Sequence, residues 1–244
     1  MSGLPRAVLF DLDDTLLSAY GRPAEAWAAV AREMAEVIAP LEPDAAAAAI
    51  AAFAQDFWSD PDRHREHRLD LARSRRRIVA GALARLAEAG GPSLPQAATD
   101  RLADRFTAYR DEQMSLFPGA VETLEALRDA GVRLALITNG AGHSQRAKIV
   151  RFELERHFDH IQIEGEHGFG KPEERAYRHA LASLDVGAHE AWIVGDNLEW
   201  EVAAPQALGI FSIWYDPFGD GLPEGGDIVP DRIIGALPDL LRPG

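Results

Sequence analysis

The sequence predicts an α/β protein in which an all-helical domain is inserted into a sheet-containing core. Short apolar runs that end in polar or acidic residues occur near the start of the chain and again in its second half, as buried strands of α/β sheets do. Between them, residues from about 18 to 114 show helical apolar spacing and no strand-like segment. A chain of 244 residues is long enough for one large or two smaller domains.

Composition narrows the class of function. The net charge of −14 argues against a broad nucleic-acid or anionic-membrane surface, and an anionic substrate would need a locally positive pocket. With no cysteine, disulfides, thiol catalysis and thiolate zinc sites are excluded. The N-terminus lacks the pattern of a secretory signal, and the alanine-rich stretch 45–54 is too short to span a bilayer. We therefore expect a cytoplasmic protein.

The first predicted strand, residues 7–10, leads directly into a cluster of acids. Asp11, Asp13 and Asp14 come within the next four residues, and alternation along an extended chain places Asp11 and Asp13 on the same side. Crowded carboxylates repel one another unless a cation neutralises them, and hard oxygen ligands suit Mg²⁺. The alternative interpretation is a strand followed by a solvated acidic turn.

The inserted region reads as four helical stretches. A helix begins near Pro23 and is closed by Pro40, and Asp44 is predicted to cap the next. A third helical stretch is predicted over about 62–89 and a fourth over about 95–112.

The third stretch is rich in arginine. Most of these side chains should form a solvated helix face with i,i+4 ion pairs, and one or two could contact an anionic substrate, because guanidinium binds phosphate and carboxylate bidentately. The residues are Arg63, Arg65, Arg68, Arg73, Arg75, Arg76 and Arg77.

Polar residues also end the strands predicted in the second half. The strand 132–137 ends at Thr138-Asn139-Gly140, which would present a hydroxyl and backbone N–H groups to an anion. Lys171 stands between Gly170 and Pro172, in a defined turn. Further strands are predicted at 161–163, 192–195 and 209–214, with an edge segment near residue 228, and Asp196 comes directly after the strand 192–195.

A group of histidines and acids near residue 160 invites a metal interpretation, but its spacing fits no common zinc pattern, so we predict surface residues. The group consists of His157, His160, Glu164, Glu166 and His167.

Four of these segments resemble, in order, the motifs of the haloacid dehalogenase (HAD) superfamily of phosphohydrolases. Asp11-Leu12-Asp13-Asp14-Thr15 resembles motif one, DxDx[TV], and Thr138 resembles motif two. Lys171 resembles motif three, and the segment from Gly195-Asp196 to Glu201 resembles motif four, GDxxxxD, with Glu in place of the final Asp. The longer arm of Glu201 leaves its direct participation open.

The resemblance implies a role for each motif residue. Asp11 would be the nucleophile and Asp13 the general acid and base, while Asp14 is given no chemical role. Thr138, Asn139 and Lys171 would bind the phosphoryl group. Thr138 and Lys171 would also be catalytic residues, and Lys171 would pair with the carboxylate of the nucleophile.

The Mg²⁺ ligands implied by the resemblance are Asp11, Asp13 and Asp196. The implied fold is a Rossmann-like parallel-sheet core of residues 1–17 and 115–244, with an inserted all-helical cap of residues 18–114 that selects the substrate. The implied function is Mg²⁺-dependent hydrolysis of a small phosphate monoester through an aspartyl-phosphate. The expected partner is a small phosphorylated metabolite, bound by a monomer or homodimer.

Other functions compete with this one. A sugar-phosphate mutase shares the core and the first half-reaction, and no motif in the chain separates the two. The dehalogenase branch lacks an acid two residues after the nucleophile, so Asp13 disfavours it. A response-regulator receiver lacks the helical insert. A non-enzymatic binding protein with a relict site is the remaining alternative.

Overall fold

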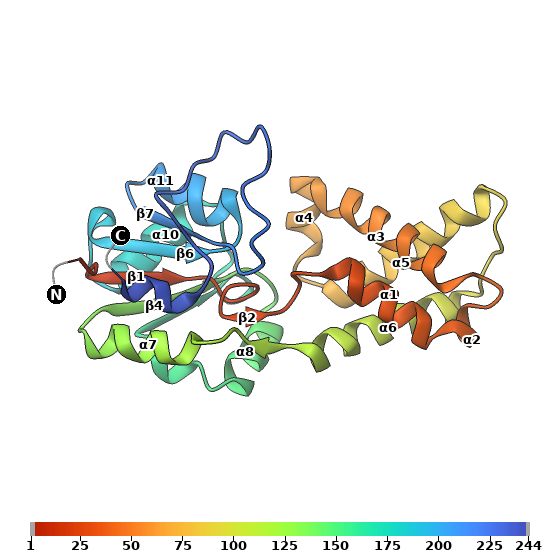
Figure 1. The fold of residues 1–244 in the computed structure, drawn as a ribbon, viewed down its shortest axis with the longest axis horizontal. Coiled ribbons are helices and arrows are strands. Elements are labelled where there is room, and N and C mark those ends of the chain that lie inside the picture. The colour runs from red at the N-terminus through yellow and green to blue at the C-terminus, as the bar shows by residue number, and fades with distance from the viewer. Residues whose placement is uncertain (1–2, 243–244) are drawn as a thin grey trace. The chain divides into compact units, whose positions relative to one another are not determined.

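The computed structural model describes residues 3–242 (Figure 1). The chain divides into two compact units, one made of the residues up to Ser18 and from Ser115 onward, the other of Ala19–Met114. The sequence boundary placed after residue 17 lies one residue earlier than this division. Among the described residues, no helix is both long enough and apolar enough to cross a bilayer.

The first unit contains a six-stranded sheet in the order β5-β4-β1-β6-β7-β8, in which every neighbouring pair is parallel. The strands are β1 (Ala7–Phe10), β4 (Arg133–Thr138), β5 (His160–Ile163), β6 (Ala191–Gly195), β7 (Phe211–Tyr215) and β8 (Arg232–Ile234). The predicted α/β class is therefore confirmed. The last strand begins after Pro230 rather than near residue 228, because proline cannot donate a hydrogen bond to a strand ladder.

Helices cover both faces of this sheet, with α10 and α11 on one side and α7 and α8 on the other (Figure 1). Alternate residues of β1, such as Ala7 and Leu9, pack with Tyr177 and Leu181 of α10 in one buried cluster. The helical segments are α7 (Ala120–Asp129), α8 (Gly142–Arg151), α9 (Glu164–His167), α10 (Glu174–Ser183) and α11 (Ala204–Gln206), the π-helical turn η3 (Leu198–Ala203), and the 3₁₀ turns η1 (Glu155–His157), η2 (Ala188–Glu190) and η4 (Leu237–Leu241).

A short antiparallel pair, β2 (Leu17–Ser18) with β3 (Ser115–Leu116), joins the two chain segments of the first unit at the point where the insert leaves and returns. Their pairing brings residues almost a hundred positions apart in sequence into register.

The second unit is all-helical, as predicted, and no strand occurs within residues 19–114, all of which the structure describes. Its helices are α1 (Pro23–Glu33), α2 (Ala35–Ile38), α3 (Pro43–Ser59), α4 (Pro61–His67), α5 (Leu71–Glu88) and α6 (Gln96–Gln113). Its core centres on Trp27, whose ring stacks on Phe106 with centroids 3.5 Å apart, and on buried aliphatic residues such as Ile50 and Leu102.

Two helix boundaries in this unit differ from the prediction. The helical stretch expected over 62–89 is divided into two helices, α4 and α5, because Asp70 accepts a hydrogen bond from the Arg73 N–H, as an N-cap does. Asp44 does not cap α3. Pro43 begins that helix, and Asp44 lies in its first turn, paired with Arg32.

The arginine-rich segment is more deeply packed than predicted. Arg68 and Arg75 are buried, and the Arg75 guanidinium lies 5.5 Å from the ring centroid of Phe106. Arg76 pairs with Asp104 of α6 at 2.7 Å, across two helices rather than along one. These contacts hold α5 against α6 within the helical unit.

Candidate active site

Three neighbouring strands bring predicted site residues to one edge of the sheet. β1 lies between β4 and β6, and Phe10 is in register with Leu136 and Val194. Asp11 and Asp196 come directly after their strands, and Thr138 is the last residue of β4. Because parallel strands end at the same edge, these residues meet at the carboxyl edge, where α/β sheets bind ligands.

Lys171 forms the buried centre of this edge. Its Nζ lies 2.5 Å from Asp11 Oδ1 and 2.6 Å from Glu201 Oε1, and its side chain is 1% exposed. Burial raises the pKa of Asp11, against the lowering effect of the Lys171 charge. Although burial alone disfavours its charge, the two carboxylates raise the pKa of Lys171 above its ordinary value. Lys171 is therefore held as a cation between two acids.

Glu201 is an integral member of this cluster despite its longer arm. It lies in η3, and its Oε2 accepts a hydrogen bond from the Asn197 N–H at 3.0 Å. A Cβ on Gly195 would lie 2.1 Å from Glu201 Cγ, so the glycine makes room for the longer side chain. Burial raises the pKa of Glu201 to about 7, while Lys171 opposes that rise.

Asn139 holds the lysine-bearing turn. Its Nδ2 donates to the Lys171 carbonyl at 2.7 Å, and its Oδ1 accepts from the Lys171 N–H at 2.9 Å. Gly170 permits this approach, since a Cβ there would lie 2.5 Å from Asn139 Oδ1. Both polar groups of the Asn139 side chain are thus engaged with backbone, so its contribution to substrate binding would come from its main chain.

Asp13 is held by two residues of α8 that sequence reasoning missed. Lys148 Nζ lies 2.7 and 2.8 Å from the two carboxylate oxygens of Asp13. Gln145 Nε2 donates to Asp13 Oδ2 at 2.8 Å and to Thr138 Oγ1 at 2.5 Å. A lysine and a glutamine three residues apart, on the helix after the Thr138 turn, were the available signal.

The predicted surface placement of the acid and histidine group is wrong for two of its members. His157 and Glu164 are buried. Glu164 Oε2 accepts a hydrogen bond from the Gly140 N–H at 3.0 Å, so this N–H of the predicted anion-binding turn is already paired. Glu164 therefore shapes the turn that comes after Thr138.

The acids around Lys171 carry more negative charge than one lysine balances. Burial raises the pKa of Asp196 well above its ordinary value, and the nearby charges of Asp11 and Glu201 raise it further. Within the described part of the chain, Asp196 forms no ion pair. Carboxylate oxygens that carry unbalanced negative charge suit a Mg²⁺ ion. Asp11 and Asp196 therefore fit the predicted metal site, whereas Asp13 would have to exchange Lys148 for the ion.

Comparison with known proteins agrees with these motifs. A phosphoserine phosphatase of Thermus thermophilus is 38% identical over 156 residues, which are 64% of this chain and 60%, or less than two thirds, of that enzyme. A glyceraldehyde 3-phosphate phosphatase of Pyrococcus furiosus is 27% identical over 242 residues, covering 97% of this chain and 92% of that one.

Similarity extends to the fold and to a family model. The magnesium-bound crystal structure of YfnB from Bacillus subtilis, described as a HAD-hydrolase, matches with a TM-score of 0.70 at 25% identity, covering 98% of this chain and 97% of that one. The model of the haloacid dehalogenase-like hydrolases matches residues 5–209, a range that contains all of the motif residues from Asp11 to Glu201. The chain therefore belongs to the haloacid dehalogenase-like hydrolase family.

Proposed function

We propose that the protein is a Mg²⁺-dependent phosphatase that hydrolyses a small phosphate monoester through an aspartyl-phosphate on Asp11. The observation that carries this proposal is the pairing of the buried Asp11 carboxylate with Lys171 at the carboxyl edge of the sheet, beside Asp13. A carboxylate whose charge is offset by a fixed cation can approach a phosphoryl group that is itself anionic. Relatives named as phosphatases support the reaction class.

In the first half-reaction, an Asp11 oxygen attacks phosphorus and the bond from phosphorus to the ester oxygen breaks. Asp13 gives its proton to that oxygen, so the product leaves as a neutral alcohol. Lys171 and the Thr138 hydroxyl would stabilise charge on the phosphoryl oxygens. A bound Mg²⁺, held by Asp11 and Asp196, would supply further neutralisation of that charge.

In the second half-reaction, Asp13 removes a proton from water as the water oxygen attacks phosphorus. The bond between phosphorus and the Asp11 oxygen breaks, which restores both acids and releases inorganic phosphate. Lys148 and Gln145 contribute by holding the Asp13 carboxylate in one place throughout.

The test measures release of inorganic phosphate, in the presence of Mg²⁺, from phosphoserine, triose phosphates, sugar phosphates and nucleoside monophosphates. The Asp11→Asn variant is the negative control. We expect inorganic phosphate from at least one ester. Conversion of a sugar phosphate into its isomer without phosphate release would instead identify a mutase, and release of halide from a 2-haloacid would identify a dehalogenase. Inactivity of the intact, magnesium-loaded protein on all of these compounds would count against the proposal.

Lys148→Met should lower kcat for alkyl phosphates by about tenfold, because Asp13 loses the cation that orients its carboxylate. This is a part of the rate acceleration of about 10²–10⁴-fold that general acid catalysis supplies. Acetyl phosphate, whose leaving group needs little protonation, should be affected much less. Lys148→Arg should recover part of the loss, since it restores the charge. Equal losses on the two substrate types would show that Lys148 does not act through Asp13.

Removing one acid should stabilise the metal-free protein. In excess chelator at neutral pH, Asp196→Asn should raise the unfolding temperature, by about 2–4 °C for each kcal/mol of relieved repulsion. Because the pKa of Asp196 is raised, its charged form is the destabilising one, so the advantage of the variant should fade as the pH approaches the ordinary value of 3.8. Added Mg²⁺ should stabilise the wild type and not the variant. Equal stabilisation of both proteins by Mg²⁺ would place the ion elsewhere.

A further inference from the structure

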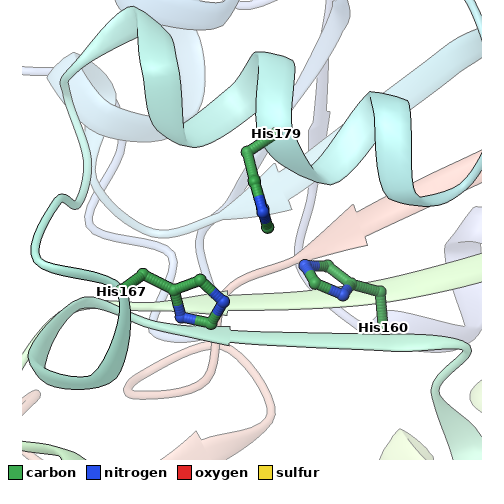
Figure 2. Close-up of side chains that lie close together, drawn as sticks. All are labelled: His160, His167 and His179. Atoms are coloured by element: carbon green, nitrogen blue, oxygen red, sulfur yellow. The ribbon is translucent and has the colours of Figure 1, made fainter.

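Three histidines from different elements of the first unit converge beside the edge strand of the sheet (Figure 2). His160 begins β5, His167 ends α9, and His179 lies in α10. One ring nitrogen from each lies within 4.8 Å of the other two. The ring centroids are 5.2 Å apart for His160–His179 and His167–His179, and 6.1 Å apart for His160–His167.

Hydrogen bonds set which nitrogens face the centre. His167 Nδ1 lies 3.1 Å from the Ile163 carbonyl, which can only accept, so Nδ1 carries the proton and Nε2 the lone pair. His179 Nδ1 lies 2.8 Å from Gln162 Oε1. The amide of Gln162 is oriented by its Nε2, which donates to the Ala176 carbonyl at 3.0 Å, so His179 Nδ1 is also the donor. Two imidazoles therefore have Nε2 free as a ligand atom.

The third histidine, His160, has a ring nitrogen without a hydrogen-bond partner in the described part of the chain. His160 Nε2 is buried and has no hydrogen-bond partner among residues 3–242. Figure 2 shows the His160 and His167 rings turned toward each other across the gap below His179. A buried ring nitrogen without a partner is uncommon in folded proteins, and it points to a ligand at this position.

The protonation state suits a metal ligand. Burial lowers the pKa of His160, and the neighbouring His179 and His167 lower it further. Burial also lowers the pKa of His179, with added effects of His167 and Arg175. Neutral imidazole, the form that binds metals, is thus favoured near neutral pH.

We propose that His160, His167 and His179 form a binding site for a divalent transition-metal ion of the Zn²⁺ class, separate from the acids around Lys171. Tetrahedral coordination with Zn–N bonds of about 2.0–2.1 Å would place imidazole centroids roughly 5 Å apart, close to the spacing of these three rings. The Nδ1 bonds of His167 and His179 to oxygen acceptors are the outer contacts that orient metal-binding histidines. The fourth position would be left to water.

The nitrogen ligands also select against the ion proposed for the acid cluster. Mg²⁺ prefers oxygen ligands, whereas imidazole suits Zn²⁺, Co²⁺, Ni²⁺ and Cu²⁺. Phe169 lies beside the site, with its ring centroid 5.8 Å from that of His167 and 5.5 Å from that of His179, and would shield one side of the ion. The two sites should therefore bind different metals at the same time.

The test measures Zn²⁺ affinity by competition with a chromophoric chelator, using tag-free protein in millimolar Mg²⁺. All proteins in this test carry Asp196→Asn, which removes a carboxylate ligand from the proposed Mg²⁺ site. The Zn²⁺ that they bind can then be assigned to the histidines. We expect one equivalent of Zn²⁺ at micromolar affinity or tighter. His160→Gln and His179→Gln should each weaken binding at least tenfold, whereas His189→Gln, at an exposed histidine outside the cluster, should not.

Circular dichroism of each variant shows whether weaker Zn²⁺ binding comes from the missing imidazole or from an unfolded protein. If His160→Gln does not fold, the partly exposed His179 still provides the decisive variant. A protein that leaves all Zn²⁺ with a micromolar chelator, or one whose affinity is the same with and without His179, would overturn the proposal. An increase in unfolding temperature with Zn²⁺ that disappears in His179→Gln would support it independently of catalysis.

Discussion

Asp11→Asn is expected to lower phosphatase turnover by at least about a hundredfold, because an amide cannot form the covalent intermediate. The amide is nearly isosteric with the carboxylate. Its oxygen can still accept the hydrogen bond that Lys171 donates to Asp11 Oδ1, and its NH2 group can donate to the Thr15 hydroxyl, which in the wild type donates to Oδ2. Unchanged circular dichroism and an unfolding midpoint close to that of the wild type should accompany the loss.

Because Asp11 is also a proposed Mg²⁺ ligand, loss of activity alone does not identify the nucleophile. The wild-type protein, quenched in acid during turnover, should carry one phosphoryl group on the peptide that contains Asp11, and Asp196→Asn should not accumulate it. Deamidation of Asp11→Asn is excluded by mass spectrometry. If this variant then turns over faster than about a hundredth of the wild-type rate, Asp11 is not the nucleophile. Phosphoryl label on any other residue would lead to the same conclusion.

Lys171→Met should abolish activity and also destabilise the protein, since it removes the cation between Asp11 and Glu201. Breaking a buried ion pair by removing one partner typically costs about 3–5 kcal/mol, because the remaining charge is left uncompensated. Methionine replaces the lysine stem and lacks only the terminal ammonium position, so most of the loss in stability would come from the missing charge and little from an empty cavity. Chemical unfolding of the metal-free protein provides the measurement.

A double-mutant cycle separates the charge from the packing. In Lys171→Met/Glu201→Gln one orphaned carboxylate is neutralised, so stability should recover by more than about 1 kcal/mol, while activity should stay absent. Because Lys171 lowers the pKa of Glu201, which burial raises to about 7 in the intact protein, that pKa should rise further in Lys171→Met, and protonation should remove part of the uncompensated charge at neutral pH. If the two substitutions were additive in unfolding free energy, Lys171 and Glu201 would not be coupled, and the ion-paired cluster of Asp11, Lys171 and Glu201 would be wrong.

Features that depend only on neighbouring residues in the chain, such as a strand and the polar residue at its end, were predictable from the sequence. An apolar run that ends in an acid, a hydroxyl or a glycine indicates a strand and also the polar residue that follows it. The strands β1, β4 and β6 could therefore be predicted together with Asp11, Thr138 and Asp196. The family and the α/β class were predictable from the order of these motifs, which the family model over residues 5–209 supports.

Tertiary structure decided the contacts between elements. Lys148 reaches Asp13 and Glu201 reaches Lys171 because α8 and η3 pack beside the strand ends, and packing of helices on a sheet is not encoded in any local spacing. The division of the 62–89 stretch depended on whether Asp70 caps a helix or lies inside one, and the helical spacing of the apolar residues does not distinguish these two cases.

The histidine cluster shows the same limit most clearly. Sequence spacing could suggest a metal site only if its ligands lay on one or two adjacent elements, as in common zinc motifs. In this protein His160, His167 and His179 come from a strand, a short helix and a longer helix, and they meet only when α10 lies over the edge strand β5. The sequence alone determined the approximate positions of the strands of the parallel sheet, the motif residues and the family, because these depend on local pattern, whereas the β2–β3 pair was not predicted. The pairing of Lys171 with Glu201 and the partners of Asp13 and of the three histidines were decided by the fold, because only folding brings distant side chains within bonding distance.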